Sequence, residues 1–170
     1  NKSSFECSVN FELIGTLLGL AIYNSVLLDL NFPTVVYKKL IGLESHLEDL
    51  KEFEPDLYNT LHNIQKMEDG FEDLCMTMSI SYDHFGVEEI FELIENGKDI
   101  PLTRDRRDEF IKLYVDWYFN KSIEKQFQSF KVGFYKVISK ESIRVIHTFF
   151  NISSFLTFQS LLTSSVEKKN

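Results

Sequence analysis

FELIGTLLGLAIYNSVLLDL, residues 11–30, is a long and mostly apolar run. It is nearly long enough to cross a bilayer, but the carboxylates of Glu12 and Asp29 interrupt it, which favours a buried core helix over a membrane span. Gly15 and Gly19 lie four residues apart and would let another element approach this helix closely. Apolar side chains recur at the spacing of one helix face and are expected in the core: Ile14, Leu17, Leu18, Ala21 and Ile22.

Further helices are predicted along the chain from prolines, apolar spacing and capping residues. Pro33 and Pro55 each suit the first turn of a helix, where the missing N–H has no intrahelical partner to lose. Thr103 and Ser122 are expected to cap the two later helices through their hydroxyls. The predicted helices cover residues 33–42, 47–53, 55 onward, 104–120 and 123–137.

The apolar period changes in LCMTMSI, residues 74–80. Apolar residues alternate there with smaller or polar ones, which predicts a β-strand. A turn at 82–86 and a returning strand at 87–94 complete a hairpin. The expected fold class is therefore α+β, mostly helical with one β-hairpin.

The composition is that of a globular protein: 170 residues, 44% hydrophobic and 26% charged. A chain of this length can form one compact domain whose core needs no disulfides. Residues 44–73 hold ten acidic and two basic side chains, which accounts for the net charge of −8. No basic field is present for nucleic-acid phosphates, so nucleic acid is not an expected partner. The acidic segment is expected to be a solvated surface, or else to attract a basic protein partner.

No sequence motif for catalysis, cofactor binding or metal binding is present. The two cysteines, Cys7 and Cys75, are far apart and lack zinc spacing, and the four histidines are scattered. We therefore expect no catalytic residue, no metal and no cofactor. This cysteine usage fits a reducing compartment, which predicts a cytoplasmic location, with the nucleus as an alternative.

The stretch 145–166 contains no Lys, Arg, Asp or Glu, yet eight of its residues are Ser or Thr. A membrane helix should be more apolar than this, so no membrane partner is expected. A loosely docked helix and a disordered end are both open interpretations of this stretch.

Three segments together resemble the HECT-class ubiquitin ligases. Residues 17–42, LLGLAIYNSVLLDLNFPTVVYKKLIG, are similar to a hallmark stretch of that family, and residues 47–61, LEDLKEFEPDLYNTL, are similar to the stretch that follows it. Residues 95–138, which begin with ENGKDIPLTRDRRDEF, continue the likeness in the same order. The likeness is greatest to the branch that contains the Angelman-syndrome ligase.

The resemblance implies a domain organisation. Residues 5–138 would be the later part of the family's N-terminal lobe, with about 53–118 as the subdomain that binds the conjugating enzyme. Residues 139–170 diverge into a tail rich in Ser, Thr and Phe. The family's C-terminal lobe, which carries the catalytic cysteine in a Thr-Cys motif, is absent from this sequence, and Cys7 and Cys75 match no family nucleophile.

HECT ligases accept ubiquitin from a conjugating enzyme as a thioester on their own cysteine and pass it to a lysine of a substrate protein. The resemblance therefore implies a ubiquitin-protein ligase segment whose partners are a conjugating enzyme, ubiquitin and a protein substrate. On its own, the chain is expected to be inactive because the catalytic cysteine is absent. Two alternatives stay open. One is a truncated binding module that holds conjugating enzymes without transfer, and the other is a helical scaffold or a fragment too incomplete to be stable.

The resemblance also implies a docking groove for a loop of the conjugating enzyme, formed by two helices and a hairpin strand. The implied residues form pairs at i, i+4 on a helix or i, i+2 on a strand, so each pair shares one face. The alternative from the residues alone is that all six belong to the ordinary core. Met67 is a weaker further candidate. The six implied contact residues are Leu57, Leu61, Leu74, Met76, Phe110 and Tyr114.

Overall fold

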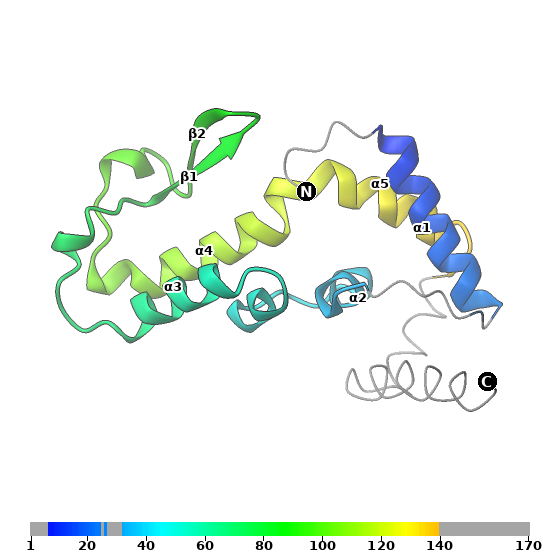
Figure 1. Cartoon of the computed structure of the whole chain (residues 1–170), viewed down its shortest axis with the longest axis horizontal. Coiled ribbons are helices and arrows are strands. Elements are labelled where there is room, and N and C mark those ends of the chain that lie inside the picture. Colours follow the sequence, from blue (N-terminus) through cyan, green and yellow to red (C-terminus); the bar gives the residue numbers. More distant parts are fainter. Residues whose placement is uncertain (1–6, 25, 27–31, 140–170) are drawn as a thin grey trace. The chain divides into compact units, whose positions relative to one another are not determined.

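The computed structural model describes residues 7–24, 26 and 32–139, which form two compact units (Figure 1). We call residues 33–39 and 43–124 the hairpin unit, and the remaining described residues the two-helix unit. Chain length alone predicted a single domain, whereas the contacts within the chain divide it into these two parts. The uncharged stretch discussed above lies outside the described residues.

The two-helix unit contains α1 (Ser8–Tyr23) and α5 (Glu124–Tyr135), which lie side by side (Figure 1). The first residue of α5, Glu124, belongs to the hairpin unit. Glycines make this approach close. A Cβ atom on Gly15 would overlap a carbonyl oxygen of α5, and one on Gly133 would overlap a carbonyl oxygen of α1. Thr16 adds a polar contact, because its Oγ1 lies 3.2 Å from the carbonyl oxygen of Gly133. The sequence expectation of close approach at the glycines of the first helix is therefore confirmed.

The burial of α1 differs from the expectation. Leu18 and Ala21 are buried as predicted, but Ile14 and Leu17 are 40% and 51% exposed, so their placement in the core is wrong. The reason is that α5 packs on the narrow strip that contains the glycines, which leaves the larger apolar side chains beside it uncovered. Within the described ranges, no helix has both the length and the apolar character that a membrane crossing requires. Other exposed apolar side chains of α1 are Val9, Leu13, Leu20 and Tyr23.

The hairpin unit is built from short helices around one antiparallel hairpin, with α3 lying against α4 (Figure 1). Its α-helices are α2 (Thr34–Leu40, whose last residue belongs to the other unit), α3 (Pro55–Lys66) and α4 (Arg107–Phe119). Its strands are β1 (Ser79–His84) and β2 (Val87–Glu92). Its 3₁₀ helices are η1 (Leu47–Glu52), η2 (Glu72–Leu74), η3 (Gly97–Asp99), η4 (Arg104–Arg106) and η5 (Lys121–Ile123).

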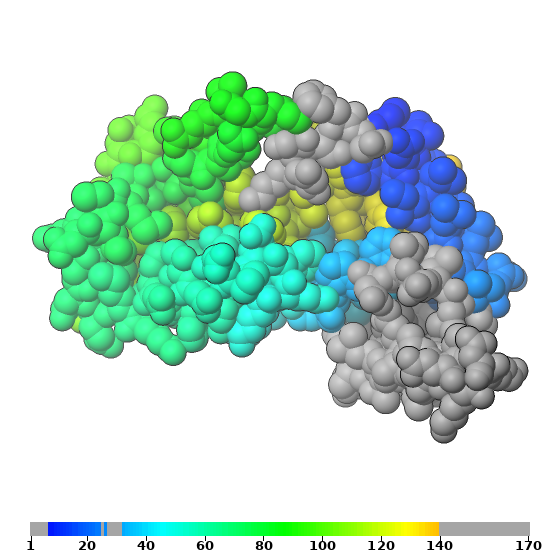
Figure 2. Space-filling model, viewed as in Figure 1, coloured from blue at the N-terminus to red at the C-terminus, as the bar shows by residue number. Residues whose placement is uncertain are grey.

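One hydrophobic cluster forms the core of the hairpin unit and joins α3, α4, η1 and the hairpin. On one side of this core, Lys38 on α2 forms an ion pair with Asp49 on η1, with 2.6 Å between Nζ and Oδ1. Figure 2 shows the side chains of η1 and α3, in cyan to teal, as a continuous surface. The largest fully buried side chains of this core are Phe110, Leu50, Leu61, Met78 and Leu102.

The hairpin confirms the α+β fold class, but its first strand begins later than predicted. Residues 72–74 form a 3₁₀ turn, and Cys75 has a left-handed backbone with φ of 48°, outside the β region that a regular strand requires. Met78 N then donates to the Ile100 carbonyl rather than to a hairpin partner. The apolar side chains at 74, 76 and 78 therefore come from an irregular segment before β1, and only residues 79 and 80 of the predicted alternation belong to the strand.

The turn and the helix caps also differ from the expectation. The turn comprises only Phe85 and Gly86, because β1 and β2 are paired as far as His84 and Val87. The predicted cap at Thr103 makes no side-chain hydrogen bond, and the Ser122 hydroxyl donates to the Tyr118 carbonyl instead. In both places a 3₁₀ turn precedes the α-helix, so the first free N–H groups do not lie over these hydroxyls.

Candidate functional site

The structure brings the six residues implied by the resemblance to one hydrophobic cluster in the hairpin unit. Two of them have almost no accessible surface, because Leu61 is 1% exposed and Phe110 is 0% exposed. These two side chains therefore lie beneath the surface and do not form part of it. The partly buried members, which pack against the cluster and reach the surface, are Leu57, Leu74, Met76 and Tyr114.

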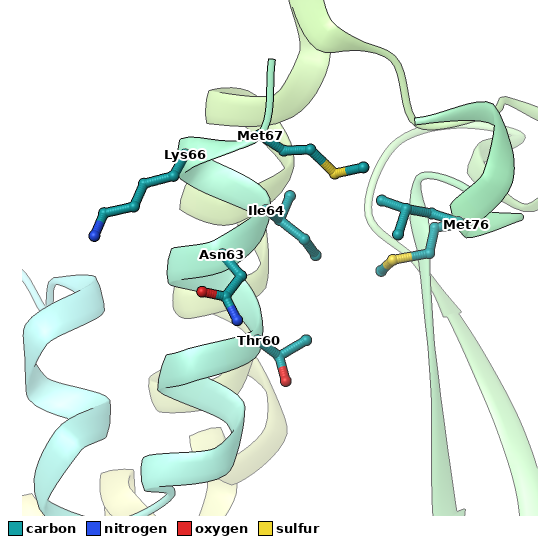
Figure 3. A pocket seen from close by; sticks show the side chains of 7 residues that line it. Thr60, Asn63, Ile64, Lys66, Met67 and Met76 are labelled. Atoms are coloured by element: carbon teal, nitrogen blue, oxygen red, sulfur yellow. The ribbon is translucent and has the colours of Figure 1, made fainter. Parts of the chain in front are cut away.

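A pocket of about 480 Å³ opens between α3 and the segment that follows η2. Figure 3 shows Thr60, Ile64 and Met67 extending from the α3 side towards Met76, whereas Lys66 extends the other way. The pocket thus contains two of the implied residues and the weaker candidate Met67. Its lining comprises Thr60, Asn63, Ile64, Lys66, Met67, Leu74 and Met76.

The α3 wall follows from helical spacing. Thr60, Ile64 and Met67 are separated by four and three residues and therefore lie on one side of the helix and its end. The core contacts of Leu57 and Leu61 run along a neighbouring strip of the same helix. Thr60 and Ile64 are not among the residues implied by the resemblance, although their spacing of four is a sequence signal that could have identified them.

The opposite wall is shaped by irregular backbone. Leu74 ends η2, Cys75 adopts the left-handed conformation and is exposed, and Met76 comes next. The Met76 carbonyl accepts a hydrogen bond from Leu102 N at 2.8 Å, which ties this wall to the segment before α4. Leu74 and Met76 therefore line the same wall of the pocket because of this irregular backbone, and not because they alternate along a strand as predicted.

The aromatic residues of α4 form part of the apolar cluster. The rings of Phe110 and Tyr114 meet edge to face, with 5.8 Å between centroids, and Tyr114 makes a similar contact with Trp117 at 6.0 Å. Burial raises the pKa of Tyr114, and the negative charge of Glu54 raises it further. The Tyr114 hydroxyl is therefore neutral at physiological pH and available as a hydrogen-bond donor.

Several acidic residues are adjacent in sequence to the residues that line the pocket. Of the ten carboxylates in residues 44–73, all except Asp49 are exposed. Four of them lie directly beside the walls: Glu68 and Asp69 follow Met67 in sequence, and Glu72 and Asp73 precede Leu74. The apolar lining and these neighbouring carboxylates suit a partner that presents an apolar side chain near basic groups. The charges are not all negative, because Lys66 also lines the pocket and Glu68 is paired with Arg104.

The described residues place no group of three His, Cys, Asp or Glu side chains close enough together to hold a metal ion. Both cysteines are exposed, and neither lines the pocket. The Ile64, Met67, Leu74 and Met76 side chains in the lining suit the pocket to binding an apolar group.

Comparisons with known proteins extend these observations. The model of the HECT-domain (ubiquitin-transferase) family matches residues 1–149. "Probable E3 ubiquitin-protein ligase HERC4" of Homo sapiens is 42% identical over 139 residues, covering 81% of this chain and 13% of the relative. "Probable E3 ubiquitin-protein ligase HECTD2" of Mus musculus is 35% identical over 161 residues, covering 85% of this chain and 21% of the relative.

A fungal relative, "E3 ubiquitin-protein ligase TOM1-like" of Neurospora crassa, is 33% identical over 138 residues, which cover 81% of this chain and 3% of the relative. The chain thus spans a small part of the length of each of these curated relatives. Their names belong to branches other than that of the Angelman-syndrome ligase, so the branch expected from the sequence is not confirmed.

Proposed function

Because this chain belongs to the HECT-domain (ubiquitin-transferase) family, we propose that it docks a ubiquitin-conjugating enzyme within a ubiquitin-protein ligase. Ubiquitin would pass from the docked enzyme to a ligase cysteine that is neither Cys7 nor Cys75, and then to a lysine of a protein substrate. The placement of this ligase in the branch of the Angelman-syndrome ligase stays a prediction from the sequence motifs.

The pocket beside α3 is the observation that carries this proposal. Met67 and Met76 line it from opposite sides, and Ile64 and Leu74 complete its apolar lining. Methionine side chains adapt to the shape of an incoming group, and a large apolar side chain buried in such a pocket is a typical energetic centre of a protein interface. Its volume of about 480 Å³ accommodates one such side chain with its neighbouring backbone.

The six implied residues would have two different roles in docking. Leu57, Leu74, Met76 and Tyr114 would contact the partner, because they are partly exposed around the same cluster. Leu61 and Phe110 would hold these contact residues in place from the core. The acidic surroundings support a partner with basic groups near its apolar contact and would speed its association at low salt.

A non-catalytic variant of this proposal shares the docking step and omits the transfer. In that case the chain would hold conjugating enzymes without moving ubiquitin. Both forms predict the same pocket contacts, so docking and transfer are tested separately.

Titration of the full 170-residue chain against a panel of purified ubiquitin-conjugating enzymes tests the docking step. We expect Met76→Ala to weaken binding by about tenfold or more, since truncation of an interface anchor typically costs at least 1–2 kcal/mol. Ile90→Ala is the matched control, because Ile90 is 59% exposed on β2 and does not line the pocket. Equal binding by the wild-type chain and Met76→Ala would reject the pocket as the docking site.

A further inference from the structure

The start of α4 is connected to the end of α3 by an arginine. Arg107 Nη1 donates a hydrogen bond to the Met67 carbonyl at 3.0 Å, and Arg107 Nε donates to Asp108 Oδ1 at 3.1 Å. The Arg107 side chain is 21% exposed, so most of it lies against the protein. This contact joins residues 40 positions apart in the sequence.

The Met67 carbonyl needs such a partner. Met67 is the C-cap residue of α3, with an extended backbone, and its carbonyl lies beyond the last carbonyl that the helix itself can satisfy. A charged donor makes a stronger hydrogen bond than a neutral one. The Arg107 contact therefore fixes the backbone from which the Met67 side chain extends into the pocket.

Met67 also has contacts close to its own backbone. A Cβ atom on Gly70 would lie 3.2 Å from the Met67 Cε atom, so the methyl group already packs over the turn at Gly70. The Met67 backbone N–H donates a hydrogen bond to the Ile64 carbonyl at 3.2 Å. Arg104 contributes less, because its ion pair with Glu68 joins two side chains that are 58% and 73% exposed.

We infer that Arg107 is a positioning residue of the docking pocket: by holding the Met67 carbonyl, it fixes Met67 as one wall and so sets the affinity for the partner without touching it. This inference rests on the proposed docking function. It assigns a role to Arg107, the first residue of α4, which is not one of the six implied contact residues.

The chain provides its own reporters for this role, because it contains only three methionines. Met67 and Met76 line the pocket, whereas Met78 is 0% exposed in the core. Methionine labelled with ¹³C at its methyl group therefore gives one NMR signal for each pocket wall and one for the core. The full chain is compared with the variants Arg107→Leu, Arg107→Lys and Arg106→Leu.

Arg107→Leu, which removes every donor, should shift the Met67 methyl signal, leave that of Met78 in place and weaken binding of a conjugating enzyme roughly fivefold. Arg107→Lys keeps one charged donor and should restore most of the affinity. Arg106 is the matched control, since it is exposed and the hydrogen bond to the Met67 carbonyl comes from Arg107. Arg106→Leu should change neither the methyl signals nor the affinity.

An unchanged Met67 signal in Arg107→Leu would overturn the inference. So would unchanged affinity in that variant while Met76→Ala binds more weakly, and in that case the docking function would stand. If Arg107→Leu also shifts the Met78 signal, Arg107→Lys decides: retained affinity supports the positioning role, and lost affinity overturns it. Failure of the docking function looks different, because the wild-type chain would then bind no conjugating enzyme in the panel.

Discussion

Tyr118 and Glu54 form a side-chain contact between α4 and the start of α3. The Tyr118 hydroxyl donates to Glu54 Oε1 at 3.2 Å. Burial, followed by the charge of Glu54, raises the pKa of Tyr118 to about 12 from its usual value of 10.0. The folded state therefore favours the neutral hydroxyl, and this contribution to stability is complete below pH 10.

Tyr118→Phe should make the protein less sensitive to alkaline pH. As the pH rises from 10 to about 12, the unfolded tyrosine loses its proton before the folded one, so the wild-type free energy of unfolding falls. The variant lacks this proton and should lose less stability over the same range, as measured by urea unfolding at several pH values. The variant keeps part of the pH dependence of stability, because it still contains Tyr114, Tyr37 and Tyr135, whose pKa values are also raised.

Glu54→Gln serves as the companion variant for this prediction. It removes the negative charge but keeps an oxygen that accepts the Tyr118 hydrogen bond, so it should reduce the alkaline loss of stability by less than Tyr118→Phe does. Identical pH dependence in Tyr118→Phe and the wild-type chain would contradict the assignment of this effect to Tyr118.

Among single residues, three of those singled out from the sequence line the candidate pocket. Leu74 and Met76 line the pocket, and Met67 joins them. The depth of Leu61 and Phe110 was not predictable, because an apolar residue on a helix face has the same pattern whether it lines a groove or lies beneath it. That distinction depends on how closely other elements pack, which spacing does not encode.

At the scale of elements, the crossing of α1 and α5 depends on glycine. Gly133→Ala should lower the free energy of unfolding by about 1–3 kcal/mol, because the new Cβ atom would overlap the Glu12 carbonyl oxygen and force the two helices apart. Urea unfolding with α-helical circular dichroism as the signal measures this change.

Val132→Ala is the matched control for that prediction. Val132 precedes Gly133 on α5 and is 43% exposed, so its truncation removes little packing and should change stability by less than about 0.5 kcal/mol. Equal stability of Gly133→Ala and Val132→Ala would show that the helices do not approach at this glycine.

The elements themselves were largely predictable, and the exceptions have local causes. Pro55 begins α3, and the positive φ of Gly42 follows the end of α2, as the expected ranges require. The first strand was predicted too early because Cys75 adopts a left-handed backbone, which is rare for a residue with a side chain. The exposure of Leu17 was missed because it depends on where α5 packs, a contact between residues more than 100 positions apart.

At the scale of the whole molecule, charge is concentrated in one segment. Residues 44–73 carry a net charge of −8, which equals that of the chain, and they include the α3 wall of the pocket. Such a field accelerates association with a basic partner and is screened as salt increases. The proposed docking step should therefore be faster at low ionic strength.

The full chain should not form a ubiquitin thioester of its own. When it is mixed with a conjugating enzyme already charged with ubiquitin, we expect no new band on a non-reducing gel, because Cys7 and Cys75 match no nucleophile of the family. A Cys7→Ser, Cys75→Ser double variant is the control. A band that a thiol reductant removes, and that the double variant lacks, would contradict this expectation.

The exposed, left-handed Cys75 has a practical consequence. Its neighbours in sequence on both sides line the pocket, and Cys7 is the one other thiol in the chain. After Cys7→Ser, an environment-sensitive fluorophore could be attached at position 75 alone, between two residues of the lining. Its emission would then follow the arrival and departure of a docked molecule in real time, without altering any side chain of the lining.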